Sequence, residues 1–150
     1  MQNNECKITP SDMNCAMYAF YDGGIYCGLE NLTFKAKEII RVEPQNSEAH
    51  LLLVICWCAM LMRNIDLGYV IKYLPSRESY LAVRRFGSEK ENVFLDKIED
   101  CLKIRYELLR ETYDEFRKIK RNRARNSEFR KKFENEWINR IIAKYGVLLD

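Results

Sequence analysis

The sequence has few of the residues on which turns, metal sites and membrane spans depend. It contains six glycines, three prolines and a single histidine, His50, among 150 residues. The low glycine and proline content argues against an all-β fold rich in turns. The single histidine argues against histidine-based metal sites and catalytic triads. The longest apolar run, residues 51–62, falls short of the roughly 20 residues that a bilayer span requires. We therefore expect no membrane partner.

The sequence contains no set of residues with the spacing that catalysis or cofactor binding requires. Gly23, Gly24 and Gly28 are not followed by the Lys-Ser/Thr pair of a phosphate-binding loop. The acidic pairs at 99–100 and 114–115 are adjacent, so their side chains diverge on a helix. Because a general acid–base site needs convergent groups, we predict no enzyme activity, no catalytic residue, no metal and no cofactor.

The six cysteines are irregularly spaced and include no Cys-x-x-Cys zinc pair. Cys56 and Cys58 would be separated by about 200° on a helix, so they cannot hold one ion. The polar residues 1–10 contain no apolar stretch of the kind found in secretion signals. These features predict reduced thiols that pack as small hydrophobic side chains in a cytoplasmic protein.

The apolar pattern predicts an all-α protein with five to seven helices in one domain, residues 1–150. Hydrophobic residues make up 47% and charged residues 31%, as in soluble globular proteins, and no alternating strand pattern occurs. We expect a loose terminus over 1–10, paired helices over 11–63, short helices over 64–87 and a long basic helical segment over 88–150. A chain of this length can form a core without disulfides or metals.

Three helices are predicted before residue 64. The first covers about 11–21, after capping signals at 9–12, and the glycines at 23–24 end it. The second begins at 29 or 30 and ends at 42, because Pro44 stops it. The third, over 48–63, follows a cap at Asn46 or Ser47. It is apolar on nearly every side, which predicts that it forms the centre of the core around Trp57.

The later helices are separated by few breaks. Short helices are predicted within 64–75 and, after a cap at residue 76, over 77–86. Ser88 and Glu91 fit a capping box for a helix that reaches at least residue 116 and is interrupted on its apolar face by Arg105. That face carries Phe94, Ile98, Leu102, Leu109, Tyr113 and Phe116. Either one helix continues to residue 146, or a break at 122–126 separates two helices, with a cap at Asn126-Ser127.

The turn after residue 42 resembles part of the tetratricopeptide repeat (TPR), a helical pair of 34 residues. The matching positions are the terminal proline at Pro44, the packing residues Ala36, Ile39 and Ile40 of the second helix, and Ala49 and Leu53 of the next repeat. The upstream Tyr-Asp-Gly-Gly-Ile-Tyr at 21–26 resembles the loop between the two helices. About one and a half degenerate repeats would cover residues 12–63.

The resemblance implies a scaffold whose concave face holds a peptide or helix of another protein. The distance from Gly24 to Pro44 is longer than in the family, and no second repeat follows Arg63. Stacked repeats usually need about three units, so the C-terminal helices are expected to cap the pair. The alternative is that the pair is only a helical hairpin that supplies core.

Positive charge is concentrated between residues 117 and 132, where nine basic residues accompany one acid, Glu128. The basic residues are Arg117, Lys118, Lys120, Arg121, Arg123, Arg125, Arg130, Lys131 and Lys132. Because acids do not alternate with them, pairing between residues four apart cannot neutralise them. They form either a solvated face, which meets the acidic body of this protein or of a partner, or a binding surface for an anionic ligand such as nucleic acid.

The last helix carries an apolar stripe of Phe129, Phe133, Trp137 and Ile141. The four-residue spacing favours core packing over stacking on bases. If the helix projects from the fold, the stripe would instead bind another protein or a second copy of the chain. The leading hypothesis is a non-catalytic protein-interaction scaffold or adaptor of TPR-like type, with another protein as partner. The alternative is RNA or DNA binding through the basic segment.

Overall fold

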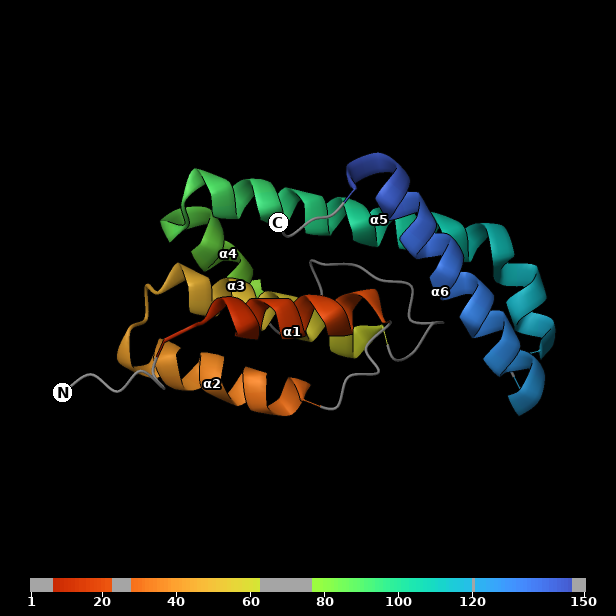
Figure 1. The fold of residues 1–150 in the computed structure, drawn as a ribbon, viewed down its shortest axis with the longest axis horizontal. Helices are drawn as coiled ribbons and strands as arrows, with labels where there is room; N and C mark the ends of the chain where they lie inside the picture. Colours follow the sequence, from red (N-terminus) through yellow and green to blue (C-terminus); the bar gives the residue numbers. More distant parts are fainter. Residues whose placement is uncertain (1–6, 23–27, 63–76, 120, 147–150) are drawn as a thin grey trace.

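The computed structural model describes residues 7–22, 28–62, 77–119 and 121–146 and is all-α. It contains no strand within these ranges. The helices are α1 (Pro10–Tyr21), α2 (Leu29–Val42), α3 (Ser47–Leu61), α4 (Arg77–Phe86), α5 (Glu89–Ile119) and α6 (Arg123–Tyr145). Helices α1 to α3 lie side by side, and the long α5 extends past them with α6 folded back across it (Figure 1). The predicted fold class is confirmed.

The start of α1 is set by a local capping box. Thr9 Oγ1 accepts a hydrogen bond from the backbone N–H of Asp12 (3.1 Å), and the Asp12 carboxylate accepts one from the Thr9 N–H (2.9 Å). The same carboxylate accepts a hydrogen bond from Lys35 Nζ of α2 at 2.7 Å. One side chain therefore both begins α1 and joins it to α2.

The turn between α2 and α3 forms as the sequence predicts. Asn46 is the N-cap, and its Oδ1 accepts a hydrogen bond from the Ala49 N–H at 3.0 Å. Helix α3 ends at Leu61, two residues before the predicted end at 63. The helical pair is thus present, while its assignment to the TPR family stays a prediction.

Helix α3 is the centre of the core. It packs against α1, α2, α4 and α5, and nearly all of its side chains from Ala49 to Ala59 are buried. Trp57 is an exception, because it lies partly exposed at the edge of the helix, where Lys37 Nζ is 5.4 Å from the ring centroid. The core therefore surrounds the middle of α3 rather than Trp57.

His50 is a structural residue in this core. Its ring nitrogens lie 2.7 Å from the Pro44 carbonyl oxygen (Nε2) and 2.9 Å from Ser79 Oγ (Nδ1). A carbonyl can only accept, so Nε2 donates to Pro44, and in the neutral ring Nδ1 accepts from the Ser79 hydroxyl. The chain's single histidine thus joins the α2–α3 turn to α4.

The predicted capping box at the start of α5 is confirmed. The Ser88 N–H donates to Glu91 Oε1 (2.9 Å), and the Glu91 N–H donates to Ser88 Oγ (3.1 Å). Glu91 also accepts a hydrogen bond from Ser47 Oγ at 2.9 Å. The N-termini of α3 and α5 are therefore held together at one end of the molecule.

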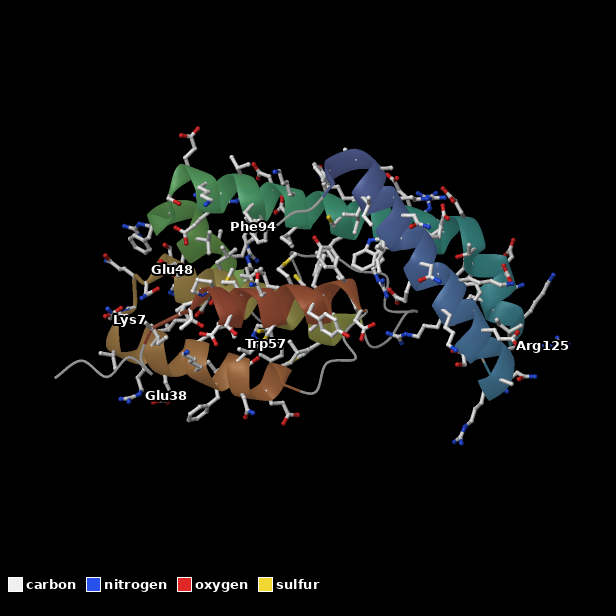
Figure 2. The ribbon with its side chains drawn as sticks, viewed as in Figure 1. Lys7, Glu38, Glu48, Trp57, Phe94 and Arg125 are labelled. Carbon is white, nitrogen blue, oxygen red and sulfur yellow. The ribbon has the colours of Figure 1, made fainter. Side chains whose placement is uncertain are left out.

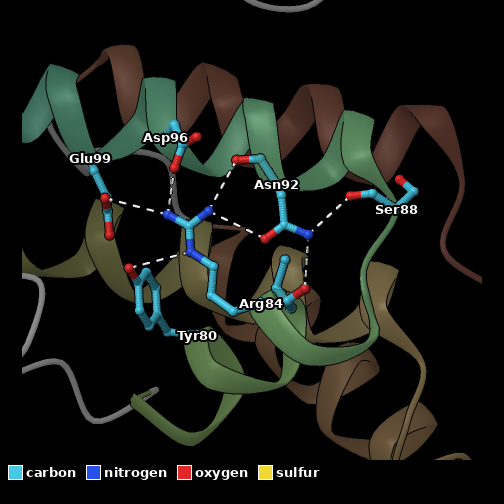
Figure 3. Close-up of polar contacts among 7 residues, drawn as sticks. Tyr80, Arg84, Ser88, Asn92, Asp96 and Glu99 are labelled. Atoms are coloured by element: carbon cyan, nitrogen blue, oxygen red, sulfur yellow. Dashed lines mark hydrogen bonds and ion pairs between the residues drawn. The ribbon is translucent and has the colours of Figure 1, made fainter.

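Arg84 fixes α4 against α5 through a polar cluster (Figure 3). Its guanidinium donates to the main-chain and side-chain oxygens of Asn92, each at 3.2 Å, and to Asp96 Oδ1 at 2.6 Å. It also lies 3.4 Å from Glu99 Oε2 and packs over the ring of Tyr80. Asp96 and Glu99 therefore act as structural partners of the Arg84 guanidinium.

The C-terminal segment forms two helices, which decides between the alternatives left open by the sequence. The N-cap of α6 is Asn122, whose Oδ1 accepts a hydrogen bond from the Arg125 N–H at 3.2 Å. The cap expected at Asn126-Ser127 was therefore wrong, because those residues already lie inside α6. The earlier start brings Phe129 of α6 against Phe116 of α5, with ring centroids 5.4 Å apart.

Some predictions fall on residues outside the described ranges. They are most of the loose terminus, the glycine break at 23–24, the short helix within 64–75 and the cap at residue 76. The single-domain organisation also stays a prediction. None of the described helices is both long and apolar enough to cross a bilayer.

Candidate anion-binding corner

The exposed cations of the predicted basic segment gather where α5 ends and α6 begins. We call this set the basic corner: Arg117, Lys118, Arg121, Arg123, Arg125, Lys131 and Lys132, all of which are exposed. This end of α5 and α6 extends beyond α1–α3, and Arg125 lies at the end of the molecule opposite Lys7 (Figures 1 and 2). The corner is therefore accessible to a large ligand.

An aromatic cluster holds the two helices of the corner together. The buried ring of Phe129 contacts Phe116 in a tilted arrangement and stacks on Phe133, with centroids 5.4 Å and 6.0 Å apart. The Ile119 carbonyl accepts a hydrogen bond from the Asn122 N–H at 2.9 Å, which closes the turn. Because the apolar side is fixed in the core, the basic side chains are displayed on a rigid backbone.

A buried ion pair joins this part of α5 and α6 to α3. Arg105 Nη1 and Nη2 donate to the two carboxylate oxygens of Glu134 at 2.6 and 2.7 Å. The guanidinium packs between Phe133 and Trp137, 5.0 and 4.7 Å from the ring centroids. The carbonyl of Met62, which caps α3, accepts hydrogen bonds from Arg105 and from Arg130. This network positions the corner relative to the bundle.

The cations of the corner differ from those where α5 and α6 cross, because no described acidic residue pairs with them. Where α5 and α6 cross, Arg140 pairs with Glu111 at 2.8 Å and Glu136 at 3.1 Å, and Lys144 pairs with Asp100. None of the seven cations of the basic corner forms an ion pair with any described residue. No acidic side chain among the described residues therefore pairs with these charges.

The N-terminus of α6 adds to this positive potential. The other five helices each have an acidic residue in the first turn, whereas α6 has none. Arg123 and Arg125 occupy that turn instead. A helix N-terminus carries about half a positive charge and stabilises anions, so cations there are unfavourable. A bound anion would relieve this repulsion.

The remaining predicted site residues lie elsewhere. Arg130 is half-buried beside Glu134, and burial lowers the pKa of its guanidinium. Lys120 lies outside the described residues. The four residues of the apolar stripe, Phe129, Phe133, Trp137 and Ile141, are buried within the chain, as their core assignment predicts. They offer no bare face in this conformation, so association of two copies through α6 stays a prediction.

Two features of the α5 face were missed by the sequence analysis. Arg105 interrupts the apolar pattern because it is paired inside the core, and the only signal for this was an isolated charge on an apolar face. Tyr113, which was assigned to that face, is 50% exposed. The only sign of this exposure in the sequence was the position of Tyr113 at the edge of the apolar face of α5.

A groove lies at the opposite end of the molecule, between α1 and the N-terminal parts of α3 and α5. Its volume is about 850 Å³. Its apolar lining includes Met13, Leu51, Val93 and Phe94, while Glu48 contributes a carboxylate. Figure 2 shows Glu48 and Phe94 at this end, away from Arg125. The groove is a second candidate binding surface.

The described cysteines show no sign of reactivity. Cys15, Cys56, Cys58 and Cys101 are free thiols, and burial raises the pKa of the last three to about 12. Such thiols stay protonated at neutral pH and are poor nucleophiles. Within the described ranges, no three side chains of the metal-binding types come together. The cytoplasmic location stays a prediction.

No protein-family model matches this chain, and neither a curated protein nor a solved structure matches it. Its function is therefore inferred from its own geometry and charges.

Proposed function

We propose that this protein binds nucleic acid through the basic corner. The observation that carries the proposal is the set of seven exposed cations at the end of α5 and the start of α6, which have no acidic partner among the described residues and extend beyond the bundle. Phosphates would supply the missing negative charges, and the N-terminus of α6 would favour them further. RNA and DNA share this phosphate chemistry.

A salt titration tests this function. Phosphate contacts release counterions, so the logarithm of the association constant falls linearly with the logarithm of salt concentration. About five contacts should give a slope near −3.5 for a single strand or −4.5 for a duplex. Fluorescence anisotropy with labelled oligonucleotides between about 50 and 200 mM salt would measure it. Absence of binding at the lowest salt would refute the proposal.

A second candidate function is the TPR-like scaffold, because the groove lies beside the helical pair that resembles the repeat. Its apolar lining suits the apolar face of an amphipathic helix, and its rim carries both acidic (Glu48, Glu89, Glu91) and basic (Lys90, Lys97) side chains. The partner would then be another protein, held mainly by apolar contacts.

Substituting Val93 tests the scaffold function. Val93 is 46% exposed and lines the groove, so Val93→Arg should leave the fold intact and place a bulky charge in the binding surface. A protein retained by the wild type in high salt should be lost with the variant. The outcome can be measured by a pull-down with Val42→Arg as control, since Val42 is 71% exposed on α2. Equal retention by both variants would argue against the groove.

A further inference from the structure

One exposed face of α5 alternates aromatic and cationic side chains and leads into the basic corner. Tyr106, Arg110, Tyr113 and Arg117 are spaced four, three and four residues apart, which places them on one side of a helix. All four are exposed, with Tyr106 at 43% and Tyr113 at 50%. We call these residues the tyrosine stripe. Arg117 belongs to both the stripe and the corner.

The stripe borders the α5–α6 contact. Helix α6 packs on α5 through Phe116, which contacts Phe129, and through Glu111, which pairs with Arg140. On a helical projection Glu111 lies on the other side of the axis from Tyr113, whereas Phe116 is next to Tyr113. Tyr113 therefore lies at the edge of this contact, with half of its surface exposed.

The chemistry of the stripe suits unpaired bases. A tyrosine ring can stack on any base, while an arginine between two rings can contact the phosphate that links neighbouring nucleotides. The ring of Tyr113 lies between Arg110 and Arg117, each about one turn away along the axis. In a duplex the faces of the bases are hidden by stacking, and the rings would have no such partner.

We propose that the tyrosine stripe is a platform for a single-stranded nucleic acid that continues from the basic corner along α5. This inference rests on the proposed function, since the corner supplies the phosphate contacts. It makes the ligand a single strand rather than a duplex. Tyr113 stacks on a base, and Arg110 and Arg117 contact the flanking phosphates.

The acidic residues beside the stripe define one of its borders. Glu107 and Asp114 are exposed on the adjacent flank of α5, and Asp114 follows Arg110 by four residues. Their charges repel phosphate, which directs the strand toward the tyrosine side. Replacing Asp114 with Asn should therefore strengthen single-strand binding, by about twofold.

The test compares Tyr113→Ala with Tyr113→Phe. Loss of the ring should weaken binding of a labelled oligothymidylate about tenfold, whereas Phe keeps the ring and should bind within about twofold of wild type. Binding of a duplex of equal length should be the same for all three proteins. Tyr18→Ala is the matched control, because Tyr18 is a 62% exposed tyrosine on a different helix, α1. Fluorescence anisotropy gives each affinity.

The other outcomes separate this inference from the proposed function. If Tyr113→Ala binds the oligothymidylate like wild type, the platform is refuted while binding by the corner stands. Failure of the wild type to bind either nucleic acid refutes both. Tyrosine-dependent binding to anionic phospholipid vesicles, without oligonucleotide binding, would also overturn both proposals, because rings and cations could then lie at a membrane surface.

Discussion

The variant R121E/R123E/R125E should bind oligonucleotides at least about 100-fold more weakly than wild type near 50 mM salt. Each substitution removes one cation from the basic corner and adds a charge that repels phosphate. The slope of log affinity against log salt should become shallower by about two for a single strand, as three contacts are lost. Fluorescence anisotropy across a salt series measures both quantities.

The fold of this variant should be preserved. All three arginines are exposed and lack acidic partners among the described residues, and two of them lie in the first turn of α6. A carboxylate is favourable at a helix N-terminus, so the midpoint of thermal unfolding should stay equal or rise slightly. The matched control is R41E/R85E/K90E, which makes the same change in net charge on α2, α4 and the start of α5. Equal weakening by both triple variants would mean that total charge, rather than the corner, controls binding.

Removing Glu134 should produce a large loss of stability, although its side chain adds no apolar surface to the core. Glu134→Ala leaves the buried guanidinium of Arg105 without its bidentate partner and removes the carboxylate beside Arg130. Breaking a buried ion pair on one side typically costs about 3–5 kcal/mol. Urea denaturation followed by circular dichroism would measure the change in the free energy of unfolding.

Two companion variants separate charge from packing. Arg105→Met should cost less than Glu134→Ala, because Arg130 Nε remains 3.8 Å from the Glu134 carboxylate. The double variant R105M/E134L replaces both charges with apolar groups and should be more stable than Glu134→Ala, as expected when no charge is left buried alone. A Glu134→Ala protein within about 1 kcal/mol of wild type would show that water reaches the pair and satisfies Arg105.

Local sequence signals are enough to predict the helices of the described chain and most of their ends. The capping boxes at Thr9–Asp12 and Ser88–Glu91 and the cap at Asn46 join residues three apart, so the residues that decide each start lie within one turn. The central position of α3 was also predictable, because a helix that is apolar on all sides can be stable only when other elements surround it.

The candidate sites could be predicted from the sequence only in part. The run of nine basic residues is evident in the sequence. It does not indicate which of these cations form ion pairs with acidic residues that are distant in the sequence. Arg130 has Glu134 beside it, whereas Arg121, Arg123 and Arg125 pair with no acid within the described part of the chain. Arg105 and Glu134 are 29 positions apart, and their pairing depends on how α6 folds back over α5.

Tertiary structure alone decided where α6 begins and which side of α5 faces solvent. Two asparagines near residue 124, Asn122 and Asn126, can cap a helix, and the start at Asn122 accompanies the packing of Phe129 against Phe116. The same packing buries Leu109 and leaves Tyr113 at the surface. Capping bonds form within one turn of chain, whereas burial and charge pairing depend on segments distant in sequence. For that reason the helices can be predicted from residues close together in the sequence. The exposure of the basic corner and of the tyrosine stripe cannot be predicted in this way.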